Sequence, residues 1–251
     1  MSKLYSDELA GVYDKIYQGF IDYKAEYTFY AGICKKYKAN SVLELACGSG
    51  NLAKSFSESF EDYLGLDFSK PMLNLARQKY PEGNFRQGDM RNFKLPNKYD
   101  AALITGRSTS YLLLDNDLER TFASISKVVQ ESSLLIFDCI YANKFIPYIK
   151  QNPAVIHEHH TDGIRYFRKT NWSKNKDGKE RLIDWTSSYF KDNGVEVEII
   201  GNDFSIFRVF KIEEIKSLLA KIGFQVLDIS ERKTYAFDTF VVVAKYKANL
   251  Y

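Results

Sequence analysis

The sequence predicts an α/β protein with a doubly wound, mainly parallel sheet, and two observations point to this class. Short apolar segments of strand length alternate along the chain with segments of helix length. The apolar segments are continuous runs, which is typical of parallel strands that are buried on both faces. The parallel strands are expected at residues 41–47, 63–68, 84–89, 99–105 and 133–140.

Helices are expected between these strands. The first helical segment, residues 6–37, begins with a typical start at Ser6 and should be broken near Gly19. Ser69-Lys70-Pro71 combines a cap residue with an early proline, which predicts another helix start. The remaining helices are expected at residues 51–60, 69–80, 117–130 and 211–222.

The regular alternation stops after about residue 153. Three segments of alternating polar and apolar residues follow, separated by Asp177-Gly178 and Asn193-Gly194, which are typical of hairpin turns. We therefore expect an inserted antiparallel three-stranded lid. The expected units are a helical cover (1–37), an α/β domain (38–150 with 206–251) and the lid (151–205).

Composition and charge narrow the class of protein. The chain has 45% hydrophobic and 27% charged residues, as ordinary globular proteins do. A net charge of +3 is too balanced for a protein that mainly grips a nucleic-acid backbone. A cytoplasmic protein is expected, because neither a signal peptide nor a membrane span is found. Three separated cysteines exclude a disulfide framework and a CxxC zinc site.

A glycine-rich loop follows the first strand. Gly48, Gly50 and Ala53 form a GxGxxA pattern between a strand and a helix, where the backbone can turn sharply and approach a ligand. Asp67 ends the next strand, where a carboxylate can accept both hydroxyls of a ribose. The pattern predicts a nucleoside site, with a purely structural turn as the alternative. Taken alone, it fits NAD and S-adenosylmethionine equally well.

Two features favour S-adenosylmethionine over NAD. Glu44 lies inside the first strand, where a carboxylate can reach a cationic amino group. Asp89 and Met90 close the third strand, where the carboxylate can accept from an adenine amino group and the thioether can cover the ring. A short-chain dehydrogenase would also need a Tyr-x-x-x-Lys pair, which the sequence lacks.

The motifs VLELACGSG, LGLDFSKPML, QGDMRNF and YDAALITGRS resemble, in order and spacing, those of class I S-adenosylmethionine-dependent methyltransferases. The resemblance covers about residues 40–140 and the final strand pair. It implies a Rossmann-like seven-stranded sheet with the last strand antiparallel, S-adenosyl-L-methionine as cofactor and S-adenosyl-L-homocysteine as product. Ala46 departs from the pattern, since many members have a glycine there. The implied cofactor-binding residues are Tyr17, Glu44, Ala46, Gly48, Ser49, Gly50, Asp67, Phe68, Met72, Asp89, Met90, Thr105 and Gly106.

The N-terminal segment narrows this resemblance. Tyr13-Asp14-Lys15-Ile16-Tyr17, followed by Asp22-Tyr23 and Glu26, is similar to small-molecule N-methyltransferases that act on amino sugars. The expected reaction is therefore N-methylation of an amine or amino sugar by a monomer or homodimer. O-methylation, RNA methylation through the basic segment 165–181, and a binding module that holds S-adenosylmethionine without turnover remain alternatives.

The chemistry needs few reactive groups. Methyl transfer from a sulfonium is an in-line displacement, so the enzyme mainly positions the nucleophile and excludes water. Tyr13 and Tyr17 share a helix face, which fits either a role over the site or an aromatic stripe in the core. No metal site is expected beside the histidines, because Glu158 points to the other strand face. Candidates for positioning or base catalysis are Tyr13, Tyr17, Tyr111 and His159. Candidates for acceptor contact are Ser108, Tyr111, His157 and Arg165.

Overall fold

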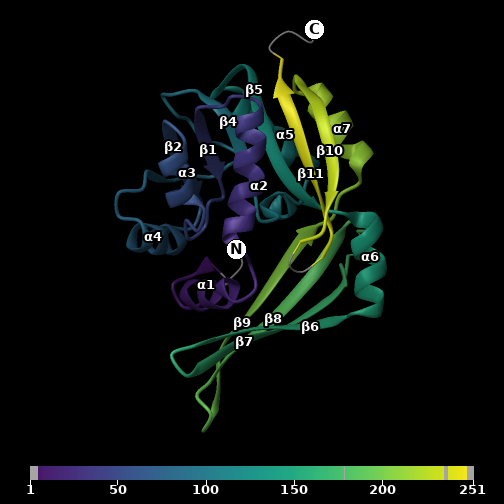
Figure 1. Cartoon of the computed structure of the whole chain (residues 1–251). Helices are drawn as coiled ribbons and strands as arrows, with labels where there is room; N and C mark the ends of the chain where they lie inside the picture. The colour runs from purple at the N-terminus through teal and green to yellow at the C-terminus, as the bar shows by residue number, and fades with distance from the viewer. Residues whose placement is uncertain (1–4, 178, 235–236, 248–251) are drawn as a thin grey trace.

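The computed structural model describes residues 5–177, 179–234 and 237–247 of the chain (Figure 1). The strands of its larger sheet, in their order across it, are β10 (Phe224–Arg232), β11 (Thr239–Tyr246), β5 (Val129–Ile140), β4 (Tyr99–Ile104), β1 (Ser41–Leu45), β2 (Asp62–Asp67) and β3 (Phe85–Gln87). The first five strands in chain order run parallel, and β11 is antiparallel to both of its neighbours. The predicted fold class is therefore confirmed.

Both faces of this sheet are covered by helices. The helices of this part are α2 (Tyr23–Lys36), α3 (Ala53–Ser59), α4 (Lys70–Lys79), α5 (Asp115–Ser126) and α7 (Ile212–Lys221). Val42 of β1 is buried in a core with α2 and α3, and the next residue, Leu43, is buried in the opposite core with α5 and α7. Because neighbouring residues of a strand are buried in opposite cores, both must be apolar, which explains the continuous apolar runs. Burial of each such side chain contributes roughly 2 kcal/mol to stability.

The helix start predicted at Ser69 is confirmed, whereas the start predicted at Ser6 is wrong because the first helix begins at Ala10. Ser69 caps α4, because its Oγ accepts from the backbone nitrogen of Met72 at 3.2 Å. The first helical segment is divided at Gly19 into α1 (Ala10–Gln18) and α2. The sequence did not indicate α6 (Ala142–Gln151), which contains Pro147. None of the helices in the described ranges is long and apolar enough to cross a membrane.

The lid is a separate antiparallel sheet of four strands. Its strands are β6 (Ala154–Thr161), β7 (Ile164–Lys174), β8 (Leu182–Asp192) and β9 (Val197–Arg208). The prediction of three strands was therefore wrong, because β6 adds an edge strand. Asp162 and Gly163 join β6 to β7 with φ of +52° and +74°, the two left-handed conformations of a tight hairpin turn. This Asp-Gly pair is a hairpin signal in the sequence that the prediction of three strands overlooked.

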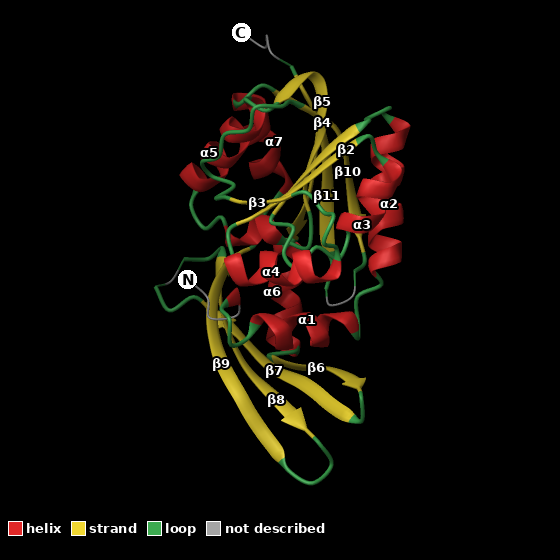
Figure 2. Cartoon of the chain, turned by 90° about the vertical axis from the view of Figure 1, so that its left-hand side faces the viewer, coloured by secondary structure: helices red, strands yellow, loops and turns green. Residues whose placement is uncertain are grey.

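Helix α1 lies between the two sheets, with the lid on one side and the carboxyl edge of the larger sheet on the other (Figure 2). Ile16 and Tyr17 of α1 are buried in an apolar cluster with Tyr166 of β7 and Tyr189 of β8. The same helix is joined to the glycine loop by polar contacts described below. Helix α1 therefore connects the lid to the larger sheet.

The root of the lid has its own apolar core. Phe145 of α6 is 1% exposed, and its ring lies 5.7 Å from that of Trp172 and 5.5 Å from that of Phe207. These contacts join α6 to β7 and β9. The lid is therefore fixed at one end by packing, whereas its distal hairpins extend away from the larger sheet (Figure 1).

We expect Phe145→Ala to lower the free energy of unfolding by about 3–5 kcal/mol, because it leaves a cavity in this core. Urea denaturation followed by circular dichroism measures the change. The matched control is Leu227→Ala, whose side chain is 36% exposed and should change stability by less than about 0.5 kcal/mol. An equal, small effect of both substitutions would contradict the assignment of Phe145 to a tightly packed core.

Candidate active site

The glycine loop between β1 and α3 is wound tightly. Ala46, Gly48 and Gly50 all adopt φ between +57° and +69°. A Cβ atom on Gly50 would lie 2.9 Å from that of Ala76, so the loop packs on α4 without room for a side chain there. Ala46 stands where the family pattern has glycine. Its left-handed backbone conformation costs about 1 kcal/mol of conformational energy, because the Cβ atom is crowded there.

This loop borders a cavity of about 510 Å³ at the carboxyl edge of the parallel strands. Ligands of open α/β sheets bind at this edge. Gly50 does not line the cavity but lies behind the loop against α4. The predicted residues that line it are Tyr13, Tyr17, Glu44, Ala46, Gly48, Ser49, Asp67, Phe68, Met72, Asp89, Met90, Thr105, Gly106, Ser108 and Tyr111.

Glu44 is the most deeply buried carboxylate of the cavity wall. It is 3% exposed, and its oxygens accept hydrogen bonds from the hydroxyls of Tyr63 at 2.6 Å and Thr105 at 3.4 Å. Burial raises the pKa of Glu44 to about 7, although both hydroxyls oppose the shift. A carboxylate held between neutral donors is suited to a cationic ligand.

Asp67 is held in place by the two segments that follow β1 and β2. Its carboxylate accepts from the backbone nitrogens of Gly48 at 2.8 Å and Ser69 at 2.7 Å. Burial raises the pKa of Asp67, while the bonds from these backbone nitrogens oppose the rise. The side chain also lines the cavity, so it can accept hydroxyls of a ligand while it fixes the glycine loop.

Asp89 has a strong partner that the sequence did not indicate. Arg91 donates to both of its carboxylate oxygens, at 2.7 to 3.1 Å, and this pairing lowers the pKa of Asp89. Arg91 also lines the cavity. A ligand amino group would therefore share the Asp89 carboxylate with Arg91.

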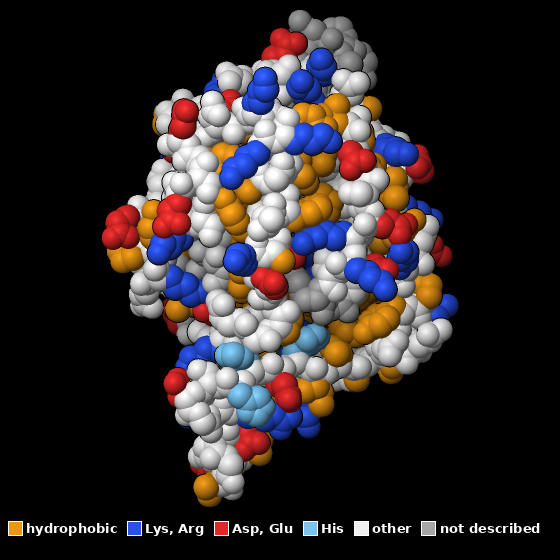
Figure 3. All heavy atoms as spheres, viewed as in Figure 1, with side chains coloured by type: hydrophobic (Ala, Val, Ile, Leu, Met, Phe, Trp, Pro, Cys, Tyr) orange, Lys and Arg blue, Asp and Glu red, His pale blue; other side chains and the backbone are white. Residues whose placement is uncertain are grey.

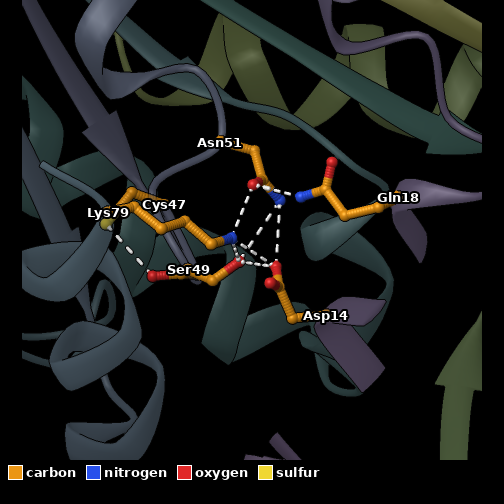
Figure 4. A network of polar contacts seen from close by, with 7 residues as sticks. Asp14, Gln18, Cys47, Ser49, Asn51 and Lys79 are labelled. Atoms are coloured by element: carbon orange, nitrogen blue, oxygen red, sulfur yellow. Dashed lines mark hydrogen bonds and ion pairs between the residues drawn. The ribbon is translucent and has the colours of Figure 1, made fainter. Parts of the chain in front are cut away.

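A network of polar side chains joins α1 to the glycine loop and to α4 (Figure 4). The Asp14 carboxylate accepts from Ser49 Oγ and from Lys79 Nζ, both at 2.5 Å. Lys79 also donates to Asn51 at 2.7 Å, and Gln18 of α1 donates to the same oxygen at 2.7 Å. Two turns of α1 are therefore bound to the loop that backs the cavity.

Aromatic rings form the wall opposite the glycine loop. The rings of Tyr13 and Tyr17 lie 3.8 Å apart, and the Tyr5 hydroxyl donates to that of Tyr111 at 2.8 Å. Burial raises the pKa of Tyr5, Tyr13 and Tyr111, so these phenols stay protonated at neutral pH. Their ring faces attract cations. Tyr5 precedes the first helix and was missed, since no sequence pattern connects it with the site.

The histidines lie on the lid, where Figure 3 shows them gathered. His157 contacts Arg168 at 3.0 Å and stacks on Phe20, and burial lowers its pKa to about 4. His159 packs so closely on Gly19 that a Cβ there would lie 2.6 Å from its own. Among the described residues that line the cavity, neither histidine is present. The described residues also contain no cluster of three His, Cys, Asp or Glu side chains able to hold a metal ion.

Arg165 is not brought to the cavity. It lies on the opposite face of the lid, where it forms ion pairs with Glu158 at 2.6 Å and Asp192 at 3.7 Å. Arg168, on the same strand, points instead to the face of the lid that packs on α1. There it donates to the Tyr17 hydroxyl at 2.7 Å and is 2% exposed.

Comparison with known proteins identifies the class of domain. A family model described as a methyltransferase domain matches residues 42–132. A dTDP-3-amino-3,4,6-trideoxy-alpha-D-glucopyranose N,N-dimethyltransferase of Streptomyces venezuelae is 33% identical over 54% of this chain and 58% of its own length, less than two thirds. An uncharacterized methyltransferase of Bacillus cytotoxicus is 30% identical over 55% of this chain and 67% of its own length.

Solved structures share the fold over almost the whole chain. An S-adenosylmethionine-dependent methyltransferase from Clostridium acetobutylicum has a TM-score of 0.76 at 21% identity, covering 96% of this chain and 99% of that one. A SAM-bound amino pentose methyltransferase from Micromonospora echinaspora has a TM-score of 0.78 at 19% identity, covering 92% and 96%. At these identities the likeness concerns the fold alone.

We expect cofactor affinity to fall as the pH is lowered from about 7 to 5, by up to tenfold per unit. The cationic cofactor favours ionised Glu44, whose pKa of about 7 means that binding at lower pH must first displace a proton. Calorimetry in two buffers of different ionisation enthalpy would detect that proton. Glu44→Gln should bind more weakly and lose this pH dependence. An unchanged slope in the variant would assign the titration to another group.

We expect Lys79→Met to raise the dissociation constant of the cofactor about tenfold, or 1.4 kcal/mol, because it leaves the buried Asp14 carboxylate without its cation. Fluorescence or calorimetric titration measures the change. Lys54→Met is the matched control, since Lys54 lies at the surface and pairs there with Glu58. Equal affinities in both variants would show that the network does not hold α1 over the cofactor.

Proposed function

Because the chain belongs to the S-adenosylmethionine-dependent methyltransferases, we propose that it methylates the nitrogen of a small-molecule amine, with an amino sugar as the first candidate. The relative from Streptomyces venezuelae is named for such a reaction. The observation that carries the proposal is the composition of the cavity, which is walled by tyrosine rings and has a single Lys or Arg, Arg91, among its described lining residues. An amine that becomes cationic on methylation suits such walls.

The residues around the cavity fit the cofactor. S-adenosylmethionine supplies a methyl group on a positively charged sulfur. Glu44 would hold the ammonium of its methionine part, because the present partners of this carboxylate are neutral hydroxyls. Asp67 would accept the ribose hydroxyls beside Gly48, where the backbone has no side chain to block a close approach.

The tyrosines would position the acceptor rather than take its proton. Their raised pKa keeps the hydroxyls of Tyr13 and Tyr111 protonated at neutral pH, so neither serves as a base. Tyr13 and Tyr17 instead present ring faces from α1, which the lid supports from behind, and these rings would keep water from the bound acceptor. A neutral amine needs no base to attack, so orientation in a dry site is sufficient.

Other acceptors have less support. RNA binding through the segment 165–181 would need its cations in one open row, but Arg165 is paired with two carboxylates and Arg168 is buried. An alcohol acceptor would need a base to remove its proton. The candidate base His159 packs on Gly19 and His157 bonds to Arg168, and neither lines the cavity.

The acceptor class is tested by incubating the protein with S-adenosylmethionine and separate pools of amines, free and nucleotide-linked amino sugars, their hydroxyl analogues, and tRNA. We expect a mass increase of one or two methyl groups in the amine or amino-sugar pools. Methylation of only the hydroxyl analogues or only tRNA would overturn the proposal. Cofactor binding without turnover in any pool would favour a binding module.

With an active acceptor, we expect Tyr13→Leu to lower kcat/KM about tenfold, the effect of roughly 1.4 kcal/mol of lost cation–ring attraction. The matched variant, Tyr13→Phe, keeps the ring and should stay within about threefold of the parent. Steady-state kinetics at saturating cofactor measures both. Equal losses in the two variants would assign the effect to the hydroxyl instead of the ring.

A further inference from the structure

One carboxylate of the cavity wall, that of Glu26, is separate from those expected at the cofactor. The described lining residues include four acidic side chains. Three of them lie in or just after β1, β2 and β3, namely Glu44, Asp67 and Asp89. Glu26 lies in the first turn of α2 instead, and its partner Arg232 ends β10, at the opposite edge of the sheet from β3. Glu26 therefore borders a different part of the cavity.

Arg232 holds the Glu26 carboxylate in one orientation. The guanidinium donates to both carboxylate oxygens at 2.8 Å, and it lies 4.2 Å from the ring centroid of Phe29. The side chains of Glu26 and Arg232 are only 14% and 17% exposed. Such bidentate pairs combine charge with a fixed geometry. Each carboxylate oxygen has two lone pairs, and Arg232 uses one of each, so Glu26 can still accept from a donor in the cavity.

The first turn of α2 also joins Glu26 to the aromatic wall. Tyr23 lies three positions earlier on the same helix face, and it lines the cavity too. Tyr13 and Tyr23 both pack against the apolar cluster that contains Tyr17. The carboxylate and the aromatic rings therefore border neighbouring parts of the cavity, and both attract a cation.

On its other side, Glu26 lies near the segment that follows β4. Asp138 of β5 is 3% exposed and accepts from the backbone nitrogen of Arg107 at 2.8 Å. Burial raises the pKa of Asp138 to about 6, and the nearby charge of Glu26 adds to the rise. Gly106 and Ser108, on either side of Arg107, line the cavity. Glu26 is therefore close to Ser108, a predicted acceptor contact.

We propose that Glu26 orients the acceptor nitrogen by accepting a hydrogen bond from its N–H, an inference that rests on the proposed methylation of an amine. With one N–H directed at the carboxylate, the nitrogen lone pair can face the methyl group. This lone pair forms the new N–C bond, and the electron pair of the broken C–S bond returns to sulfur. The product ammonium keeps its proton until water accepts it.

The charge of Glu26 favours the transition state over the bound substrates. The nitrogen is neutral before the reaction and becomes cationic as the N–C bond forms, while the sulfur loses its charge. Attraction between Glu26 and the nitrogen therefore grows along the reaction, which lowers the barrier. Because Arg232 fixes the carboxylate beforehand, this attraction requires no reorganisation of the site.

The test compares Glu26→Gln with the parent, using an amine acceptor identified in the methylation screen. Glutamine keeps the size of the side chain and can still accept from Arg232, but it has no charge. We expect kcat to fall at least about tenfold. The dissociation constant of S-adenosyl-L-homocysteine, measured by calorimetry, should stay within about threefold, which also shows that the variant is folded.

The matched control is Glu214→Gln. Glu214 is 17% exposed and pairs with Arg208, but it is not among the described residues that line the cavity. This substitution also removes a half-buried carboxylate from an arginine, so it measures what the loss of such an ion pair does by itself. We expect it to leave kcat within about threefold of the parent.

Binding of sinefungin gives a second measurement that needs no acceptor. This analogue of S-adenosylmethionine carries an amino group in the position of the transferred methyl, so its ammonium projects toward the acceptor side. We expect Glu26→Gln to weaken sinefungin at least about threefold more than S-adenosyl-L-homocysteine, because an opposite charge close to the ammonium is removed.

A selective loss of turnover and of sinefungin affinity in Glu26→Gln supports the proposal. Amine methylation that is unchanged in this variant overturns the role of Glu26 and leaves the proposed function intact. Equal losses of kcat in Glu26→Gln and Glu214→Gln, or equal changes in the affinities of both analogues, would reduce Glu26 to a structural ion pair. Methylation of no amine in the screen overturns the proposed function and the role of Glu26 together.

Discussion

The carboxylate of Asp14 is the contact on which the enclosed site depends. It receives Ser49 of the glycine loop and Lys79 of α4 within one hydrogen-bonded group. Without it, α1 would be attached mainly through its apolar face to the lid. The cover, the loop and the lid therefore form one structural unit, because a single helix is bound by polar contacts on one side and by apolar packing on the other.

The apolar packing around the site also affects the charged groups inside it. Aromatic and aliphatic walls exclude water, which strengthens the interaction of any charge that remains inside. Glu44 illustrates the effect, since its pKa of about 7 reflects burial among neutral hydroxyls. A cation that enters the cavity replaces the missing solvation of this carboxylate. The burial of Glu44 therefore favours a positively charged ligand in addition to what its hydrogen bonds do.

The larger sheet could be predicted from the sequence, because buried parallel strands appear in it as continuous apolar runs. The glycine loop also marks the turn from the first strand to a helix. The sequence was insufficient for β6, an edge strand in which exposed and half-buried residues alternate and none is fully buried. Residues that follow strand ends, such as Asp67 and Thr105, could be placed at the site. Tyr5 could not, because it meets Tyr111 only through the fold, 106 positions away in sequence. Arg91 could not, because no motif marks it as the partner of Asp89, which lies two positions before it. Arg165 was assigned to the acceptor side, and only the register shows that it shares the face of Phe167 instead.

The two-sided lid also affects how this protein can diverge. Adjacent residues of β7, such as Arg168 and Lys169, belong to different surfaces, so substitutions at alternate positions alter one surface and leave the other unchanged. No described residue of the lid strands lines the cavity or belongs to the glycine loop, since the inner face of the lid packs on α1. Mutation of a few inward-facing lid residues can therefore change how α1 is held beside the cavity, while the glycine loop and the outer surface of the lid are inherited intact.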